Sequence, residues 1–152
     1  PIHRFNMVRE AIYGLNHMEV SDIEIRRQGK SFTIDTIRLI QKEYDASSEI
    51  FLIIGADSVT ELDTWKEIKS LSEMCKFIMI NRLGYSTESL ENLEKILDKE
   101  KVSCIKNNMV YIPPIGISST EIRKRLKNGK SIRFWTSPAV EDYIKKHKLY
   151  QD

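Results

Sequence analysis

Three consecutive hydroxyl residues and a nearby arginine form the most chemically suggestive group in this sequence: Ser118, Ser119, Thr120 and Arg123. They stand where apolar spacing predicts the first turn of a helix, and Gly129 predicts where that helix stops. A first helical turn carries unpaired N–H groups and the positive end of the helix dipole, so hydroxyl and guanidinium donors beside it favour a phosphate. The alternative is an ordinary surface helix with a serine cap and Glu121 in its first turn.

Polar residues also follow the strands that the sequence predicts. A short apolar strand at residues 109–112 leads to the hydroxyl group, the apolar run at 50–54 leads to Asp57, and the run at 76–80 leads to Arg82. In open α/β sheets, ligands bind at the carboxyl ends of the strands. Each residue alone could be a solvated loop residue, but three at one edge of a sheet favour a ligand site.

Hydrophobic periodicity predicts the elements that must position these residues. Helices are expected at 4–17, at 34–44 with Ser31 or Thr33 as cap, around Trp65 to Met74, at 86–99, after Ser118, and at 138–147. Strands are expected at 20–25, 50–54 and 76–80, with one or two more within 102–112. The run at 50–54 is apolar on both faces, which predicts a strand in the middle of a sheet. Strands and helices alternate, so parallel strands with crossovers and an α/β fold follow.

Composition bounds the class of protein. The 152 residues, of which 41% are hydrophobic and 30% charged, predict one soluble domain over 1–152. No apolar run has membrane-spanning length, and a net charge of +2 from scattered bases gives no case for a nucleic-acid surface. Cys75 and Cys104 lie in apolar sequence without metal-ligand spacing, so we expect two inert thiols, no metal site and a cytoplasmic location.

Several motifs occur in one order along the chain: Ser21-Asp22-Ile23-Glu24, Ser31-Phe32-Thr33-Ile34-Asp35-Thr36, Ile53-Ile54-Gly55-Ala56-Asp57 with Trp65 eight positions later, Asn81-Arg82-Leu83-Gly84-Tyr85, Ile117-Ser118-Ser119-Thr120-Glu121-Ile122-Arg123, and a closing segment at 140–150. In this order they resemble bacterial nicotinate mononucleotide adenylyltransferase over essentially the whole chain. The resemblance implies a Rossmann-like nucleotidyltransferase fold, a mostly parallel sheet with helices on both faces. It also implies transfer of an adenylyl group from ATP, with Mg²⁺, to nicotinate mononucleotide, giving deamido-NAD and pyrophosphate in NAD synthesis.

The resemblance also implies roles for individual residues. Ser118, Ser119, Thr120 and Arg123 would hold the ATP triphosphate, and Asp57 would meet the nucleotide ribose. Trp65 would stack on the nicotinate ring, the backbones of Thr33 and Lys66 would meet its carboxylate, Asp35 would brace that loop, and Arg82 would lie near the adenylyl side. The alternatives are that Trp65 is a core residue and that Thr33 and Asp35 only begin a helix. No general base is required, because a substrate phosphate that already exists attacks the ATP.

The chain departs from the family at its start. The family begins with a strand, a Gly-rich loop and an H-x-G-H motif, whereas here Arg4-Phe5-Asn6 follows Pro1-Ile2-His3, so we interpret His3-Arg4 as the lead-in to a later helix. A sheet without its first strand would expose apolar edges, which predicts poor solubility or a homo-oligomer for these residues alone. Whether they are active alone stays open. The alternatives are a non-catalytic nucleotide-binding or interaction module, and transfer to another phosphate acceptor such as phosphopantetheine or nicotinamide mononucleotide.

Overall fold

The structure is a computed structural model that describes residues 1–27, 29–81, 93–113 and 115–151. The chain forms two compact units, one made of Pro1–Gln28 with Ile115–Asp152 and the other of Gly29–Pro114. Each unit is described by itself. The single domain over residues 1–152 stays a prediction.

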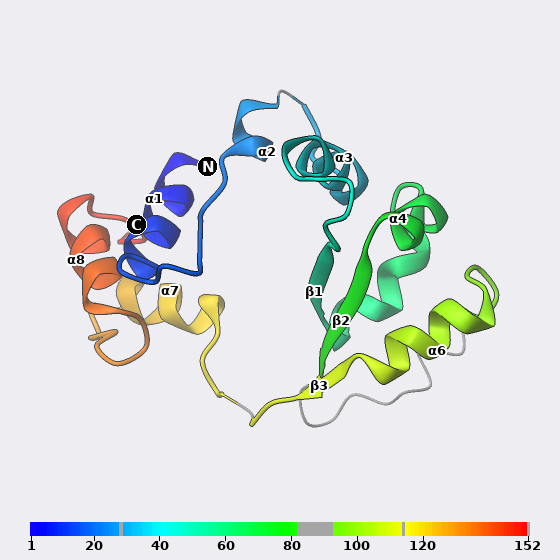
Figure 1. Cartoon of the computed structure of the whole chain (residues 1–152). Helices are drawn as coiled ribbons and strands as arrows, with labels where there is room; N and C mark the ends of the chain where they lie inside the picture. Colours follow the sequence, from blue (N-terminus) through cyan, green and yellow to red (C-terminus); the bar gives the residue numbers. More distant parts are fainter. Residues whose placement is uncertain (28, 82–92, 114, 152) are drawn as a thin grey trace. The chain divides into compact units, whose positions relative to one another are not determined.

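A parallel sheet forms the centre of the Gly29–Pro114 unit (Figure 1). Its strands are β1 (Phe51–Gly55), β2 (Lys76–Asn81) and β3 (Met109–Tyr111), in the order β1-β2-β3. Phe51 pairs with Lys76 at the start of the first ladder, and Met79 pairs with Met109 in the second. The expected α/β fold with parallel strands is confirmed.

The helices of this unit share one hydrophobic core with the sheet. They are α3 (Thr33–Glu43), the 3₁₀ helix η1 (Ala56–Thr64), α4 (Ile68–Met74) and α6 (Lys99–Asn107). The fully buried side chains of the shared core are Ile34, Leu62, Leu71, Met79, Leu93 and Val102. This core fixes the connections at both ends of β1, because each connection joins elements whose side chains are buried together.

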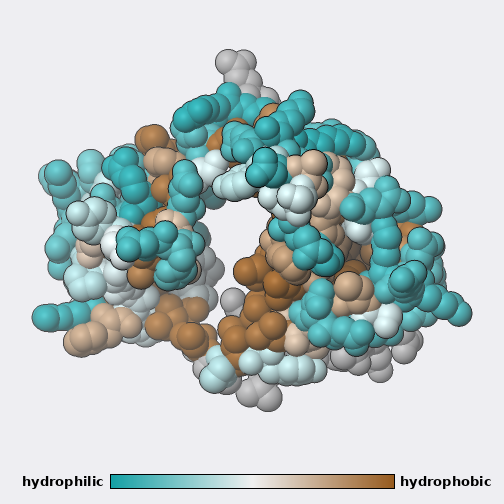
Figure 2. All heavy atoms as spheres, in the orientation of Figure 1, coloured by the Kyte–Doolittle hydropathy of each residue, from teal (hydrophilic) through white to brown (hydrophobic). Residues whose placement is uncertain are grey.

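The strand β1 is buried on one face only. Ile54 is 7% exposed, whereas its neighbour Ile53 is 65% exposed and Phe51 also faces outward. Figure 2 shows hydrophobic side chains at the surface over the region where Figure 1 draws β1 and β3. Among the described residues β1 is an edge strand of the sheet, so the expected position in the middle of the sheet is not met there.

Residues 20–25 contain a helix, so the predicted strand is wrong. The helix is α2 (Ile23–Arg26), and the carbonyl oxygen of Asp22 accepts the backbone N–H of Arg26 at 2.9 Å. The side chains of the same two residues form an ion pair at 2.8 Å. A strand needs a neighbouring strand to pair its backbone groups, whereas Asp22 provides a local partner for them.

The segment 102–112 also differs from its prediction. Residues up to Asn107 belong to α6, in which Val102 and Ile105 are both buried, and only β3 is a strand. Apolar residues three apart lie on one face of a helix, so the spacing of Val102 and Ile105 suits α6. Half of the helix expected at 86–99, residues 86–92, lies outside the described residues, and in the described half α6 begins only at Lys99.

The other unit is helical in its described part. It contains α1 (Ile2–Ala11), which ends earlier than residue 17, together with α7 (Ser119–Lys127) and α8 (Pro138–Lys146). The hydroxyl of Tyr143 on α8 accepts a hydrogen bond from Asn6 of α1 at 3.0 Å. The core of this unit consists of Ile132, Val140 and Ile144, with Met7, Ile122 and Leu126 packed against it. None of the helices within the described ranges is long and apolar enough to cross a membrane.

The two neighbouring isoleucines of β1 provide a matched test of this sheet. We expect Ile54→Ala to lower the free energy of unfolding by about 2–5 kcal/mol, the usual cost of a cavity in a core. Ile53→Ala should cost much less, because its side chain is mostly in solvent. Urea unfolding of both variants measures this, and an equal loss of stability would contradict the exposed face of β1.

Candidate functional site

Ser118 caps the helix that the sequence predicts. It is the N-cap residue of α7, and its Oγ accepts the backbone N–H of Glu121 at 3.1 Å. The helix ends before Gly129, which has φ of 65°, as predicted. The side chains of Ser119 and Thr120 in the first turn are exposed. The hydroxyl of Ser118 accepts the capping bond, and its own hydrogen is still able to donate to a ligand.

Arg123 lies one turn after Ser119, so both side chains are on the same side of α7. Both line a pocket of about 360 Å³ whose other walls are mainly apolar. The guanidinium of Arg123 lies 5.8 Å from the ring of Tyr150. The nearby Arg125 instead donates to the carbonyl oxygen of Ser131 at 2.8 Å, so it holds the turn after α7. Arg123 is therefore the better placed arginine for a ligand.

A second pocket lies in the Gly29–Pro114 unit. Its volume is about 290 Å³, and its lining residues come from the loop before α3 and from the break between η1 and α4: Ser31, Phe32, Thr33, Thr64, Trp65 and Lys66. The structure thus brings together Thr33, Trp65 and Lys66, which the resemblance names for one ligand. Thr33 is the first residue of α3, and Phe32 is its N-cap, so neither Ser31 nor Thr33 is the cap.

Trp65 lies outside any helix, so the helix predicted around it is wrong at this position. Its backbone is extended, with φ of −72° and ψ of 135°. Glu67 then takes the left-handed conformation, with φ of 52°, before α4 begins. This change of direction separates η1 from α4 and places Trp65 and Lys66 at the pocket. The indole of Trp65 is half-buried against the core, so packing and ligand stacking are both open to it.

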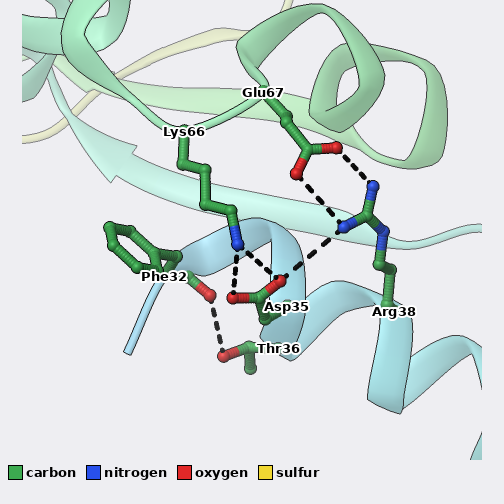
Figure 3. Close-up of polar contacts among 6 residues, drawn as sticks. All are labelled: Phe32, Asp35, Thr36, Arg38, Lys66 and Glu67. Carbon is green, nitrogen blue, oxygen red and sulfur yellow. Dashed lines mark hydrogen bonds and ion pairs between the residues drawn. The ribbon is translucent and has the colours of Figure 1, made fainter. Parts of the chain in front are cut away.

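Four charged residues link the two walls of this pocket (Figure 3). The Nζ of Lys66 lies 3.1 and 3.3 Å from the carboxylate oxygens of Asp35 and 4.8 Å from the ring of Phe32. Arg38 donates to both carboxylate oxygens of Glu67, at 2.5 and 3.4 Å, and lies 3.6 Å from Asp35. The hydrogen bond from Arg38 lowers the pKa of Glu67, and the bond to Glu67 raises the pKa of Arg38.

Sequence reasoning found Asp35 but missed Arg38 and Glu67. The spacing of Asp35 and Arg38 suits an ion pair on one helix, which is a local signal. Nothing in the sequence connects Arg38 with Glu67, because they are 29 positions apart and belong to different elements.

Asp57 stands in the first turn of η1, directly after β1, and its side chain is exposed. The carboxylate lies over the backbone of Gly55, where a Cβ atom would be only 2.2 Å from Asp57 Oδ1. Only glycine at position 55 leaves this place for the carboxylate. Arg82, the third polar residue at a strand end, lies outside the described residues.

The cysteines differ from each other. Cys75 is buried, and burial raises its pKa to about 11, so it stays a thiol at neutral pH. Cys104 is exposed, so its predicted apolar surroundings are wrong, because it lies on the outer side of α6. No group of three His, Cys, Asp or Glu residues in the described ranges could hold a metal ion.

Comparison with known proteins places the chain in a class. The Cytidylyltransferase-like family model matches residues 2–125. The chain is similar to solved structures of Plasmodium falciparum nicotinic acid mononucleotide adenylyltransferase, one of them complexed with NaAD, with a TM-score of 0.66 and 23% identity over 99% of this chain and 74% of that one. This likeness shows the Rossmann-like nucleotidyltransferase fold.

Curated relatives narrow the class to one family. The chain is 36% identical over 149 residues to a probable nicotinate-nucleotide adenylyltransferase of Moorella thermoacetica, covering 98% of this chain and 68% of the relative. It is 38% identical over 152 residues to the protein of that name in Desulfitobacterium hafniense, covering 99% and 72%. The chain belongs to the nicotinate-nucleotide adenylyltransferase family, as the order of motifs predicts.

The cap of α7 can be separated from ligand binding by substitution. We expect Ser118→Ala to lower the free energy of unfolding by about 1 kcal/mol, because the N–H of Glu121 loses its acceptor. Thr120→Ala is the matched control and should change stability little, since its side chain is exposed. Denaturant unfolding measures both, and equal losses would show that Ser118 is not a stabilising cap.

Proposed function

We propose that this protein transfers the adenylyl group of ATP to nicotinate mononucleotide, forming deamido-NAD and pyrophosphate in NAD synthesis. The observation that carries the proposal is the pocket lined by Thr33, Trp65 and Lys66, in a chain that belongs to this family along nearly its whole length. The apolar indole suits a flat aromatic ring, and the polar backbone beside it suits a carboxylate.

The pocket fits the acceptor on chemical grounds. In the proposed complex the nicotinate ring stacks on Trp65, and its carboxylate accepts hydrogen bonds from the backbone N–H groups of Thr33 and Lys66. Thr33 opens α3, where backbone N–H groups have no partner within the helix and the helix dipole favours an anion. The ion pair of Lys66 with Asp35 joins the two walls, so the pocket is held in shape before the ligand arrives.

The first turn of α7 fits the ATP triphosphate. We assign its binding to Ser118, Ser119 and Thr120 and to the guanidinium of Arg123, a set of neutral and charged donors at a helix start. Asp57 would accept hydrogen bonds from ribose hydroxyls. Mg²⁺ is usually bound through substrate phosphates with one or two carboxylates. Mg²⁺ would therefore enter with ATP.

The reaction needs positioning more than acid or base chemistry. A phosphate oxygen of nicotinate mononucleotide attacks the α-phosphorus of ATP, and the bond from that phosphorus to the pyrophosphate oxygen breaks. The attacking oxygen is already ionised at neutral pH, so no side chain has to remove a proton. Arg123 and the N–H groups of α7 stabilise the charge that develops on the departing pyrophosphate.

The proposal is tested by incubating the purified product of the complete gene with ATP labelled in the adenylate group, Mg²⁺ and nicotinate mononucleotide. We expect deamido-NAD that carries the label and an equal amount of unlabelled pyrophosphate. Neither product should form when a chelator removes Mg²⁺. Parallel reactions use nicotinamide mononucleotide and phosphopantetheine as acceptors. Preference for either would replace the assigned acceptor, and nucleotide binding without any product would favour the non-catalytic module.

The place of the Asp57 carboxylate over Gly55 allows a second test. Asp57→Ala should weaken nucleotide binding by about 1–3 kcal/mol, the scale of lost charge-assisted hydrogen bonds. Gly55→Ala should have a similar effect, because its new methyl group displaces the carboxylate. In the Asp57→Ala background Gly55→Ala should add little. Titration calorimetry with ATP measures all three variants, and independent, additive losses would contradict the steric link.

A further inference from the structure

Glu67 has a backbone conformation that calls for an explanation. It is the one non-glycine residue with positive φ in the described part of the Gly29–Pro114 unit, with φ of 52° and ψ of 45°. Side chains disfavour this region, so such a residue persists only where its surroundings hold it. Its carbonyl oxygen accepts the N–H of Leu71 at 2.9 Å, which begins α4. The conformation of Glu67 therefore decides where the chain turns from the pocket wall into α4.

Arg38 is the group that holds Glu67. Its two terminal nitrogens each donate to one carboxylate oxygen of Glu67, at 3.4 and 2.5 Å, in a two-bond geometry that fixes direction as well as distance. Arg38 belongs to α3, whose buried residues Ile34 and Ile37 anchor it in the core. The strained residue is thus tied to a rigid element.

Opposite charges face each other in the same order along α3 and along the segment that leads into α4. On α3, Asp35 is followed one turn later by Arg38, and across from them Lys66 is followed by Glu67. Asp35 binds Lys66 and Arg38 binds Glu67, as Figure 3 shows. Moving the Trp65–Lys66 segment would break both pairs at once. An isolated exposed ion pair contributes little, but two coupled pairs on a strained turn select one conformation.

We propose that Arg38 is a positioning residue for the mononucleotide acceptor: by holding Glu67 in the left-handed conformation, it fixes the Trp65 and Lys66 wall of the pocket against the Ser31–Thr33 wall. The identity of the acceptor rests on the proposed function. Arg38 itself is not among the lining residues of the pocket, so it acts through Glu67.

The test compares variants of Arg38 and Glu67 in the enzyme assay. Arg38→Ala should raise the KM for nicotinate mononucleotide about tenfold and leave the KM for ATP unchanged, because only the acceptor wall moves. Arg38→Lys should recover part of this, since lysine makes a single contact where arginine makes two. Lys42→Ala removes another exposed cation of the same helix and should behave as the wild type.

The variant Glu67→Gly separates the effect of the backbone turn from the effect of the charge on Glu67. Glycine adopts positive φ freely, so Glu67→Gly keeps the turn without the ion pair and should retain a KM within about twofold of the wild type. In that background, Arg38→Ala should have no further effect. An unchanged KM in Arg38→Ala, an equal rise in the KM for ATP, or a full tenfold loss in the Glu67→Gly background would each overturn the proposal.

A measurement without ligand distinguishes this inference from the proposed function. We expect faster amide hydrogen exchange at residues 65–68 in Arg38→Ala than in the Lys42→Ala control. If the wild type forms no deamido-NAD, the proposed function fails, while faster exchange still supports the holding role of Arg38. If the wild type forms product and Arg38→Ala exchanges and binds as the wild type does, the inference alone fails.

Discussion

The hydrogen-bonded ion pair between Arg38 and Glu67 is the constraint on which the pocket of the Gly29–Pro114 unit depends. Without it, nothing would offset the cost of a left-handed backbone at Glu67, where the chain leaves the pocket and enters α4. With it, the two ends of the turn are tied to α3, which is anchored in the core by Ile34 and Ile37. The rigidity of the pocket therefore comes from the core and reaches the surface through charged side chains.

In each of the two units, a pocket lies beside the first turn of a helix. Residue Thr33 opens α3 at one pocket, and Ser118 caps α7 beside another. The first turn of a helix offers N–H donors that need no side-chain chemistry, and both proposed substrates are anions. The structural role of Ser118 as a cap and its proposed role at a phosphate are compatible, because a capped first turn is also an ordered one.

Glycine at the end of β1 shows how the fold can reserve space for a functional group. The carboxylate of Asp57 occupies the volume that a side chain at position 55 would fill. The other face of the same strand exposes Ile53, a side chain of the kind that usually lies in a core or an interface. One short strand thus combines a buried face, an exposed apolar face and a polar end.

The sequence by itself determined the parts that depend on local patterns. The positions of β1 and β2, the cap at Ser118 and the glycine that ends α7 all agree with the prediction, because each depends on neighbours within a few positions. The order of motifs also identified the family, and it named three residues that line one pocket. Their roles with substrates stay predictions.

Only the tertiary structure decided what depends on distant partners. The segment at 20–25 alternates like a strand but forms α2, since a strand requires a partner that periodicity cannot supply. The chain leaves its helical path at Trp65 because Arg38, 29 positions before Glu67, stabilises a turn that no local signal predicts. The sequence pattern around Trp65 shows only that these residues can form a helix. The packing of α3 against α4 decides where the helix begins.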